Sequence, residues 1–371
     1  MKIDIITFHN TSNFGATLQC TALFNYLKGM GHDVEVINYL PSYVVDKKSV
    51  TKELKKVSTS GNKIKAILKG MAYIAYAGKV IKRDRRFEAF IGENLKLSRV
   101  YHTCKELQSD PPVADLYICG SDQIWNSTLT GGAPDKAFFL RFVRGKKKAS
   151  YGASMGEFDV EENGEELKRL TKDYIGISVR ESSMAPRLSK VIGRNVEAVL
   201  DCTLLLDRQN YCAMEKDYPC GKTPYLLLYN MQRSEISNRI AKKIAREKKL
   251  KIINISPNPF VRCKGARNRI DIGPGEFLTL FRNAEYVVTN SFHGTVFSIL
   301  YGKQFTSIPH STRSGRVVDL LCMLGLEDRM TEDADQIGSN MIDFEEVHQR
   351  LRECRSASNE YLNRILSGVG E

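Results

Sequence analysis

The chain has 371 residues, 42% of them hydrophobic and 26% charged, close to the average of soluble globular proteins. This composition excludes a disordered chain, a collagen-like chain and a polytopic membrane protein, and the length predicts about two or three domains. Lys and Arg outnumber Asp and Glu by 55 to 43, which gives a formal charge of +12. A basic balance favours an anionic partner, which is nucleic acid, a membrane surface or a small substrate.

The start of the chain and the cysteines indicate the compartment. No basic segment leads into an apolar one, so we expect no signal peptide. No apolar run reaches the roughly 18 residues of a spanning helix. The nine cysteines include no Cys-x-x-Cys pair, and the six histidines have no zinc-type spacing with them. We therefore expect a cytoplasmic protein with reduced thiols and no structural metal.

The first half of the chain alternates strand and helix patterns. The strands are short, apolar and β-branched, whereas the helices repeat apolar residues every three to four positions. The expected strands are 3–8, 33–39, 115–119, 149–153, 175–179 and 196–200, and the expected helices are 16–30, 161–173 and 182–192.

The pattern restarts after a turn-rich joint at 205–224. The expected strands are 225–229, 251–255, 286–288 and 305–308, and the expected helices are 234–248, 276–282, 293–301 and 345–366. Repeated strand–helix alternation predicts parallel sheets covered on both faces. We therefore expect an α/β protein with two doubly wound, Rossmann-like domains, 1–207 and 208–342, and a C-terminal helix in 343–371 that packs back on the body.

Most of the excess charge lies in residues 46–86, where thirteen Lys and Arg face three Asp and Glu. This segment falls where a crossover helix belongs. One interpretation is a helix with a solvated basic face. The other is a surface that meets an anionic membrane or a lipid-linked substrate at the inner face of the membrane. Nucleic acid is disfavoured, because no recognised nucleic-acid-binding module is present.

The first polar motif, residues 9–16, follows the first strand and opens the next helix. In doubly wound sheets this crevice holds ligands, and a helix N-terminus offers free N–H groups to an anion. Asn13 and Gly15 are therefore candidate substrate-binding residues. The motif has neither the dinucleotide fingerprint nor the Walker pattern, which disfavours a nicotinamide cofactor or a P-loop ATPase. The alternative is a simple cap, in which Ser12 or Asn13 only satisfies the helix end.

The second motif, residues 120–126, follows the strand at 115–119. Ser121, Asp122 and Gln123 place polar groups beside a glycine turn at the carboxyl end of a strand, which favours a functional role. Trp125, the single tryptophan, has two interpretations: it stacks on a sugar ring, or it packs in the core.

Two later strand ends carry weaker signals. Four of the five residues 150–154 (SYGAS) are small, which admits a close approach by a ligand near Ser154, although a plain turn explains them nearly as well. Arg180 closes the strand at 175–179, where its fork suits a carboxylate or phosphate. The alternative for Arg180 is a surface ion pair with Glu181.

The fifth motif is the most informative, because a buried strand runs through Asn290 and Ser291 into His293 at a helix start. His293 suits an acid, a base or a phosphate donor, and Gly294 allows an anion to reach backbone N–H groups up to Thr295. A histidine at such a junction favours a functional role.

Taken together, these segments resemble the polysaccharide pyruvyl transferase family. The resemblance spans roughly residues 3–320, and the matching segments occur in the family's order. They are 13–16 (NFGA), 120–126 (GSDQIWN), 150–154 (SYGAS), 178–181 (SVRE), 201–203 (DCT) and 284–294 (AEYVVTNSFHG).

The resemblance implies a GT-B-like arrangement of the two domains and a role in capsule or exopolysaccharide synthesis. Family members move the enolpyruvyl unit of phosphoenolpyruvate onto two hydroxyls of a sugar, which gives a cyclic pyruvate ketal and phosphate. Arg180 and His293 match residues that the family uses around phosphoenolpyruvate. Some members carry a second arginine near this histidine. Here Ser291 and Phe292 fill that stretch, and we expect Arg313 and Arg316 to supply the charge.

The resemblance also suggests roles for the candidate residues. His293 contacts the phosphate and moves a proton, Arg180 clamps an anionic group, and the helix start at Gly294 and Thr295 binds the anion. Asp122 is the expected base. The remaining candidates hold the substrates: Asn13, Gly15, Ser121, Gln123, Ser154, Asn290, Ser291, Arg313 and Arg316. No cofactor or metal is expected, because phosphate is only a leaving group.

Two other functions stay open. One is a GT-B glycosyltransferase that uses a nucleotide sugar. The other is a non-catalytic protein that binds carbohydrate or a lipid surface through residues 46–86. The second leaves the polar strand ends unexplained.

Overall fold

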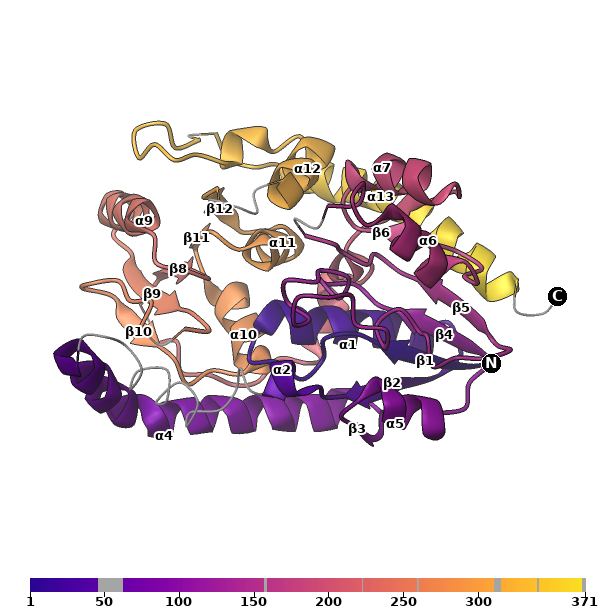
Figure 1. Cartoon of the computed structure of the whole chain (residues 1–371). Coiled ribbons are helices and arrows are strands. Elements are labelled where there is room, and N and C mark those ends of the chain that lie inside the picture. The colour runs from indigo at the N-terminus through magenta and orange to yellow at the C-terminus, as the bar shows by residue number, and fades with distance from the viewer. Residues whose placement is uncertain are drawn as a thin grey trace.

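The computed structural model describes residues 1–45, 63–156, 159–221, 223–258, 260–309, 315–338 and 340–368; for 45 and 63–76 it describes the backbone alone. Two five-stranded parallel sheets, each covered by helices, form the body of the molecule (Figure 1). The expected α/β class with two doubly wound, Rossmann-like units and a C-terminal helix is confirmed. The limits of the domains at 207 and 342 stay a prediction.

The N-terminal sheet has the strand order β3-β2-β1-β4-β5. Its strands are β1 Lys2–Ile6, β2 Asp33–Tyr39, β3 Leu97–Tyr101, β4 Leu116–Cys119 and β5 Lys147–Ser150. Every neighbouring pair is parallel; Ile3, for example, lies opposite Val34 on one side and Leu116 on the other. The order reverses between β1 and β4, so a crevice opens at the carboxyl ends of these two strands.

The C-terminal sheet repeats this order as β10-β9-β8-β11-β12. Its strands are β8 Tyr225–Tyr229, β9 Lys251–Ile255, β10 Arg267–Arg269, β11 Tyr286–Thr289 and β12 Gln304–Ser307. The central strand β8 reads YLLLY and is buried throughout, as expected for a parallel strand covered on both faces. The second reversal point lies between β8 and β11.

Helices and short elements complete the fold. The longer helices are α1 Phe14–Gly29, α4 Lys63–Asn94, α6 Gly164–Thr171, α7 Met184–Ile192, α9 Glu235–Glu247, α10 Pro274–Asn283, α11 Phe292–Leu300, α12 Gly315–Leu324 and α13 Phe344–Ser367. The short ones are α2 Ser42–Val45, α5 Cys104–Ser109, α8 Arg208–Cys212, η1 Cys202–Leu204 and η2 Glu327–Arg329, and β6 Ser178–Val179 pairs with β7 Glu197–Ala198. No helix in the described ranges combines the length and apolar character needed to cross a bilayer.

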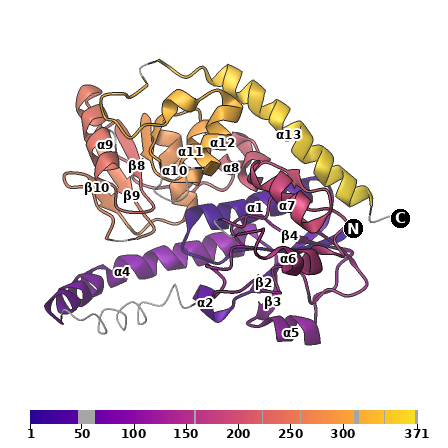
Figure 2. The ribbon, with the colours of Figure 1, turned by 45° about the horizontal axis from the view of Figure 1, so that its top comes forward.

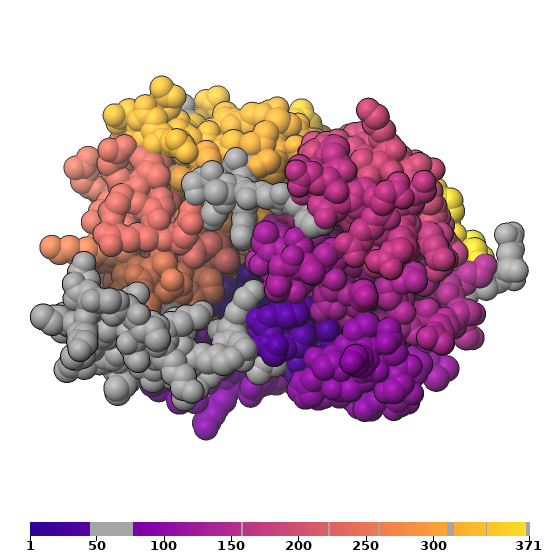
Figure 3. Space-filling model, in the orientation of Figure 1, coloured from indigo at the N-terminus to yellow at the C-terminus, as the bar shows by residue number. Residues whose placement is uncertain are grey.

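The two halves lie against each other (Figure 3), and one of the hydrophobic core clusters spans both. Phe14 of α1 stacks on Phe277 of α10, with ring centroids 4.7 Å apart and an interplanar angle of 16°. Phe87 of α4 packs on the same Phe14 ring at 5.2 Å. This aromatic contact holds the first turn of α1 against the C-terminal half.

Helix α4 crosses from one sheet to the other, as the ribbon shows from two sides (Figures 1 and 2). Arg83 donates to the Pro257 carbonyl oxygen at 2.6 Å. Arg86 donates to the Asp271 carbonyl oxygen at 2.6 Å and pairs with Glu276 at 3.0 Å. These two arginines of the basic segment therefore join the halves, a role that neither interpretation of 46–86 included. Residues 46–62 and the side chains of 63–76 lie outside the described residues.

Helix α13 also spans both halves (Figure 2). Its first turns meet the C-terminal half, where His348 Nε2 lies 2.9 Å from the Ile299 carbonyl oxygen. Its later turns meet the N-terminal half, where the Tyr361 hydroxyl donates to the Ser150 carbonyl oxygen at 2.6 Å.

Some expected elements need correction. The strand expected at 149–153 is Lys147–Ser150, because Gly152 takes a left-handed φ of +60° that extended backbone does not allow. The strand expected at 175–179 shrinks to Ser178–Val179, and the one at 196–200 to Glu197–Ala198. The edge strands β3 and β10 and the helix α12 were not expected.

Candidate active site

The first turns of α1 and α11 meet between the two sheets. α1 follows β1, and α11 follows β11, so each begins at the reversal point of its own sheet. An ideal β-carbon on Gly15 would lie 2.1 Å from Nδ1 of His293. Glycine at position 15 therefore lets the imidazole of the C-terminal half rest against the helix start of the N-terminal half.

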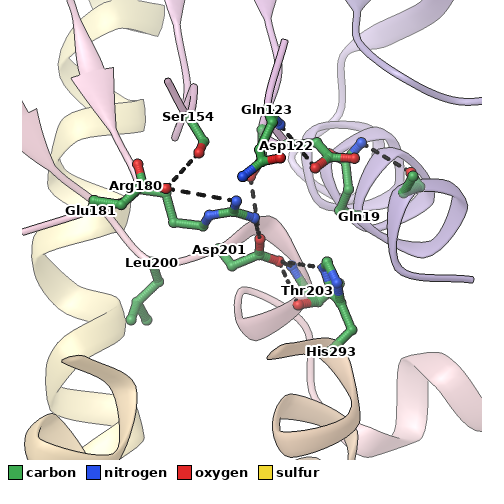
Figure 4. Close-up of polar contacts among 12 residues, drawn as sticks. Gln19, Asp122, Gln123, Ser154, Arg180, Glu181, Leu200, Asp201, Thr203 and His293 are labelled. Carbon is green, nitrogen blue, oxygen red and sulfur yellow. Dashed lines mark hydrogen bonds and ion pairs between the residues drawn. The ribbon is translucent and has the colours of Figure 1, made fainter. Parts of the chain in front are cut away.

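Asp201, just before η1, is the centre of a buried polar cluster (Figure 4). Its side chain receives Arg180 Nη1 at 2.7 Å, the Thr203 hydroxyl at 2.6 Å and the Ser121 hydroxyl at 3.3 Å. His293 Nε2 lies 3.7 Å from Asp201 Oδ1, the oxygen that also accepts the Thr203 hydroxyl. Burial alone would raise the pKa of the Asp201 carboxyl, but His293, Arg180 and Thr203 hold that pKa well below its usual range.

Arg180 is buried, with 8% of its surface exposed, which rules out the alternative of a surface ion pair with Glu181. Its Nη2 is 3.8 Å from Glu181, whose Oε1 accepts the Ser154 hydroxyl at 2.5 Å. Within the described ranges, Nε and Nη2 have no hydrogen-bond partner. Buried donors without partners cost free energy, which a bound anion would recover.

Two guanidinium groups lie over the Phe292 ring. The guanidinium carbon of Arg180 is 5.2 Å from the ring centroid, and that of Arg316 is 5.6 Å away. These cation–π contacts place both charges beside the start of α11. Arg313 lies outside the described residues.

The start of α11 has no side-chain cap, because the Ser291 side chain makes no capping hydrogen bond. The first N–H groups of a helix lack intrahelical partners and attract anions. His293, in this first turn, has a buried Nε2 without a hydrogen-bond partner in the part of the chain described. The uncapped turn, His293 and Arg180 therefore bring several unsatisfied nitrogen donors together.

Comparison with known proteins decides the family. The model of the polysaccharide pyruvyl transferase family matches residues 13–312. The chain belongs to the polysaccharide pyruvyl transferase family. No curated protein matches the chain.

Solved structures similar to this pyruvyl transferase family member are distant in sequence and show the fold alone. The UDP-GlcNAc 2-epimerase from Neisseria meningitidis bound to UDP-GlcNAc has a TM-score of 0.50 and 10% identity, over 99% of this chain and all (100%) of that one. A putative UDP-N-acetylglucosamine 2-epimerase from Listeria monocytogenes has a TM-score of 0.50 and 9% identity, over 96% and 90%. The chain spans 64% of a Thermobaculum terrenum O-GlcNAc transferase mutant, at 11% identity and a TM-score of 0.41.

In this family member, the residues around His293 are held within the protein. A β-carbon on Gly294 would lie 2.1 Å from Thr289 Oγ1, so this glycine allows α11 to pack closely on β11. Thr295 is fully buried, with its hydroxyl 3.0 Å from Ser307 Oγ. Asn290 accepts from the Met231 N–H at 2.8 Å. Gly294 therefore has a packing role that its sequence motif did not indicate, and the parts of these residues in substrate binding stay predictions.

Asp122 lies close enough to Arg180 to interact with its charge and is partly exposed. Its φ is +73°, a left-handed conformation that costs free energy in any residue but glycine. Its Oδ1 accepts the Gln123 N–H at 2.8 Å, and its charge reaches Arg180. A strained carboxylate beside a buried arginine is a feature of functional sites.

The structure decides between the alternatives for Trp125 and shows that Asn13 is a helix cap, while the part of Asn13 in substrate binding stays a prediction. Trp125 is 1% exposed, stacks on Phe139 at 4.8 Å and donates to the Phe138 carbonyl oxygen, so it packs in the core. Asn13 does cap α1, because its Oδ1 accepts the Gly15 N–H at 3.0 Å. Ser12 instead donates to Asp84 of α4 at 3.1 Å.

Sequence reasoning missed Asp201 and Glu181 as members of the site. Asp201 follows the strand expected at 196–200, in the same strand-end position as the motifs that were singled out. This position at a strand end is the signal that could have identified Asp201 from the sequence.

Proposed function

We propose that this family member transfers the enolpyruvyl unit of phosphoenolpyruvate onto two hydroxyls of a saccharide and releases phosphate. One observation carries the proposal: buried nitrogens of Arg180 and His293, which have no hydrogen-bond partner among the described residues, flank the uncapped start of α11. Such a site suits an anion with several acceptor oxygens, and phosphoenolpyruvate offers a carboxylate and a phosphate.

The charge of the site needs more than Arg180. Asp201 neutralises that guanidinium at 2.7 Å, and Asp122 and Glu181 add negative charge nearby. Arg316, on the Phe292 ring, supplies a second cation, and the helix start of α11 supplies partial positive charge. In the proposal, Arg180 and Arg316 bind the two anionic ends of the donor, and the α11 N–H groups bind phosphate oxygens.

The proposed reaction begins with protonation. His293 donates a proton to the methylene carbon, and the first sugar hydroxyl attacks the adjacent carbon, which carries the phosphate. Asp122 accepts the proton of that hydroxyl. The carbon–oxygen bond to phosphate then breaks, and the departing phosphate takes the proton from Asp122. The second hydroxyl closes the ketal and passes its proton to His293, which the first step left neutral. Asp201, whose Oδ1 lies 3.7 Å from His293 Nε2, orients the imidazole.

The residues proposed to bind the saccharide acceptor come from the sequence motifs. Asp122 and Gln123 follow β4, and Asn13 precedes α1, so these three lie across the N-terminal crevice from His293. We propose that Asn13 and Gln123 hold sugar hydroxyls of an acceptor that is lipid-linked at the inner face of the membrane. The scheme includes no cofactor, and we propose that it needs no metal ion; addition of EDTA to the reaction tests this.

The experiment combines phosphoenolpyruvate with galactose, glucose and N-acetylmannosamine acceptors and measures phosphate release and product mass. We expect activity with one acceptor and a loss of about 100-fold or more in Arg180→Ala and His293→Ala. Arg187→Ala is the control, because Arg187 is exposed and pairs with Glu161 away from the site. Near wild-type phosphate release in both site variants, with a proven acceptor, contradicts the proposal.

The fold alone is equally compatible with transfer from a nucleotide sugar. Thermal shift with phosphoenolpyruvate, UDP and CMP separates the two functions. Stabilisation by phosphoenolpyruvate that disappears in Arg180→Ala supports pyruvyl transfer, whereas stabilisation by a nucleotide alone supports glycosyl transfer.

A further inference from the structure

A cavity of about 1180 Å³ opens at the amino edge of the N-terminal sheet. It lies at the starts of β1, β4 and β5, beside the chain end marked N in Figure 1. Its residues are Met1, Gln108, Asp115, Lys136, Arg141, Val143, Arg144, Gly145, Lys146, Lys147, Lys148, Arg169, Leu170 and Asp173. Asp201 and His293 lie at the opposite, carboxyl edge, so the whole length of a strand separates this cavity from the candidate active site.

The cavity is strongly basic. Seven of its lining residues are Lys or Arg and two are Asp. Asp173 is shared by Arg141 at 3.3 Å and Lys148 at 3.5 Å. The other carboxylate, Asp115, accepts the backbone N–H of Lys2 at 2.8 Å. One lining arginine, Arg169, has an exposed partner, Glu166, at 3.4 Å.

Four cations of the cavity wall form no ion pair with any residue that the structure describes. Within the described ranges, no ion pair joins Lys136, Arg144, Lys146 or Lys147 to a carboxylate. Four like charges around one concave surface repel each other, and a low-dielectric wall concentrates their field. The wall is therefore most stable when an anion is present.

Lys148 adds a buried charge to this wall. Its side chain is 5% exposed, and desolvation, with Arg141 and Lys172 nearby, lowers the pKa of its ammonium group. Asp173 offsets this only in part. A buried ammonium among other cations is a feature of sites that neutralise anions.

We propose that this cavity binds a small anion with two or more phosphate groups. One carboxylate or one phosphate would leave most of the four free charges unbalanced. A diphosphate group matches them, and Arg144 adds a planar fork that suits phosphate oxygens. The cavity volume of about 1180 Å³ exceeds the roughly 300–1,000 Å³ typical of ligand pockets, so a larger group attached to the diphosphate also fits. This second site is separate from the proposed donor site and does not depend on it.

Calorimetric titration with inorganic diphosphate, at an ionic strength held constant with sodium chloride, tests the proposal. We expect saturable binding of one diphosphate to the cavity. The triple variant Arg144→Gln/Lys146→Gln/Lys147→Gln is expected to bind at least about tenfold more weakly, since each lost cation removes a charge-assisted contact. The variant Lys242→Gln/Lys251→Gln/Lys264→Gln removes the same charge from exposed positions outside the cavity and is expected to bind as the wild type does.

Two further arms separate the sites and the sources of phosphate. Arg180→Ala is expected to keep diphosphate affinity, which assigns the binding to the cavity instead of the candidate active site. Equal affinity in the wild type and both triple variants overturns the proposal. Binding to phosphatidylglycerol vesicles that needs the cavity cations, without saturable diphosphate binding, also overturns it, because the surface then recognises a membrane. Circular dichroism of each variant verifies that it is folded.

Discussion

Gly15 and His293 touch across the two halves of the molecule: a β-carbon on Gly15 would lie 2.1 Å from the ring nitrogen Nδ1. The contact joins the first turn of α1 to the first turn of α11, and with them the expected acceptor side to the expected donor side. The position of His293 relative to Asp201 therefore depends on how closely the two helix starts approach each other (Figure 4).

Gly15→Ala is predicted to displace His293. The added methyl has no room, so either the ring moves or the halves separate, at about 1–3 kcal/mol of stability. We expect turnover to fall by more than the loss of folded protein explains, as judged from the melting temperature. Gly29→Ala is the matched control, because Gly29 also lies in α1 and its β-carbon would have no atom within 4 Å. Equal phosphate release by both variants contradicts this role of Gly15.

Asp201→Asn is predicted to destabilise the protein by about 3–5 kcal/mol at pH 7, because it leaves the buried Arg180 without its charge partner. The pKa of Asp201 is lower in the folded protein than in the unfolded chain, so its carboxylate stabilises the fold fully at any pH above the unfolded-state pKa. This stabilisation is lost as the pH falls from the unfolded-state pKa through the folded-state pKa. The difference between wild type and variant should therefore narrow below about pH 4. Urea unfolding from pH 7 to pH 3 measures it, and a constant difference contradicts the prediction.

Asp122 offers a substitution that separates shape from chemistry. Asparagine tolerates a left-handed φ and keeps the oxygen that accepts the Gln123 N–H, so Asp122→Asn should melt within a few degrees of the wild type. If Asp122 is the base, turnover should fall by about 100-fold or more. Asp122→Ala adds backbone strain of about 1 kcal/mol. An active Asp122→Asn shows that another group accepts the proton.

Asp4 is predicted to make stability depend on pH near neutrality. It is fully buried in β1, neither carboxyl oxygen has a hydrogen-bond partner within the described ranges, and desolvation raises its pKa to about 7. The folded state therefore keeps a proton that the unfolded state releases. As pH rises from about 4 to 7, Asp4 lowers the free energy of unfolding, by about 1–4 kcal/mol in all.

Asp4→Asn removes that titration. We expect the variant to be more stable than the wild type at pH 8 and to lose this advantage by pH 4. Guanidinium unfolding at the two pH values measures the difference. An equal difference at both values shows that Asp4 does not titrate in this range.

Sequence patterns located most of the fold. The strands 33–39, 225–229 and 251–255 were predicted with the observed bounds, since each is a short apolar run between turns. Two of the edge strands were missed because their side chains are polar or exposed: β3 reads LSRVY and β10 reads RNR. Neither strand carries the run of buried apolar residues on which the prediction depends.

The sequence by itself determined the α/β class, the family resemblance and the strand ends at which polar residues gather, because strand–helix alternation and turn residues are local properties. The tertiary structure alone decided that Arg180 is buried on Asp201, that Trp125 packs on Phe139, and that Gly15 leaves room for His293. It also gathered the cavity cations from segments that the alternation did not single out. These contacts join residues far apart in the chain, and they depend on how the two sheets are oriented, which no local pattern encodes.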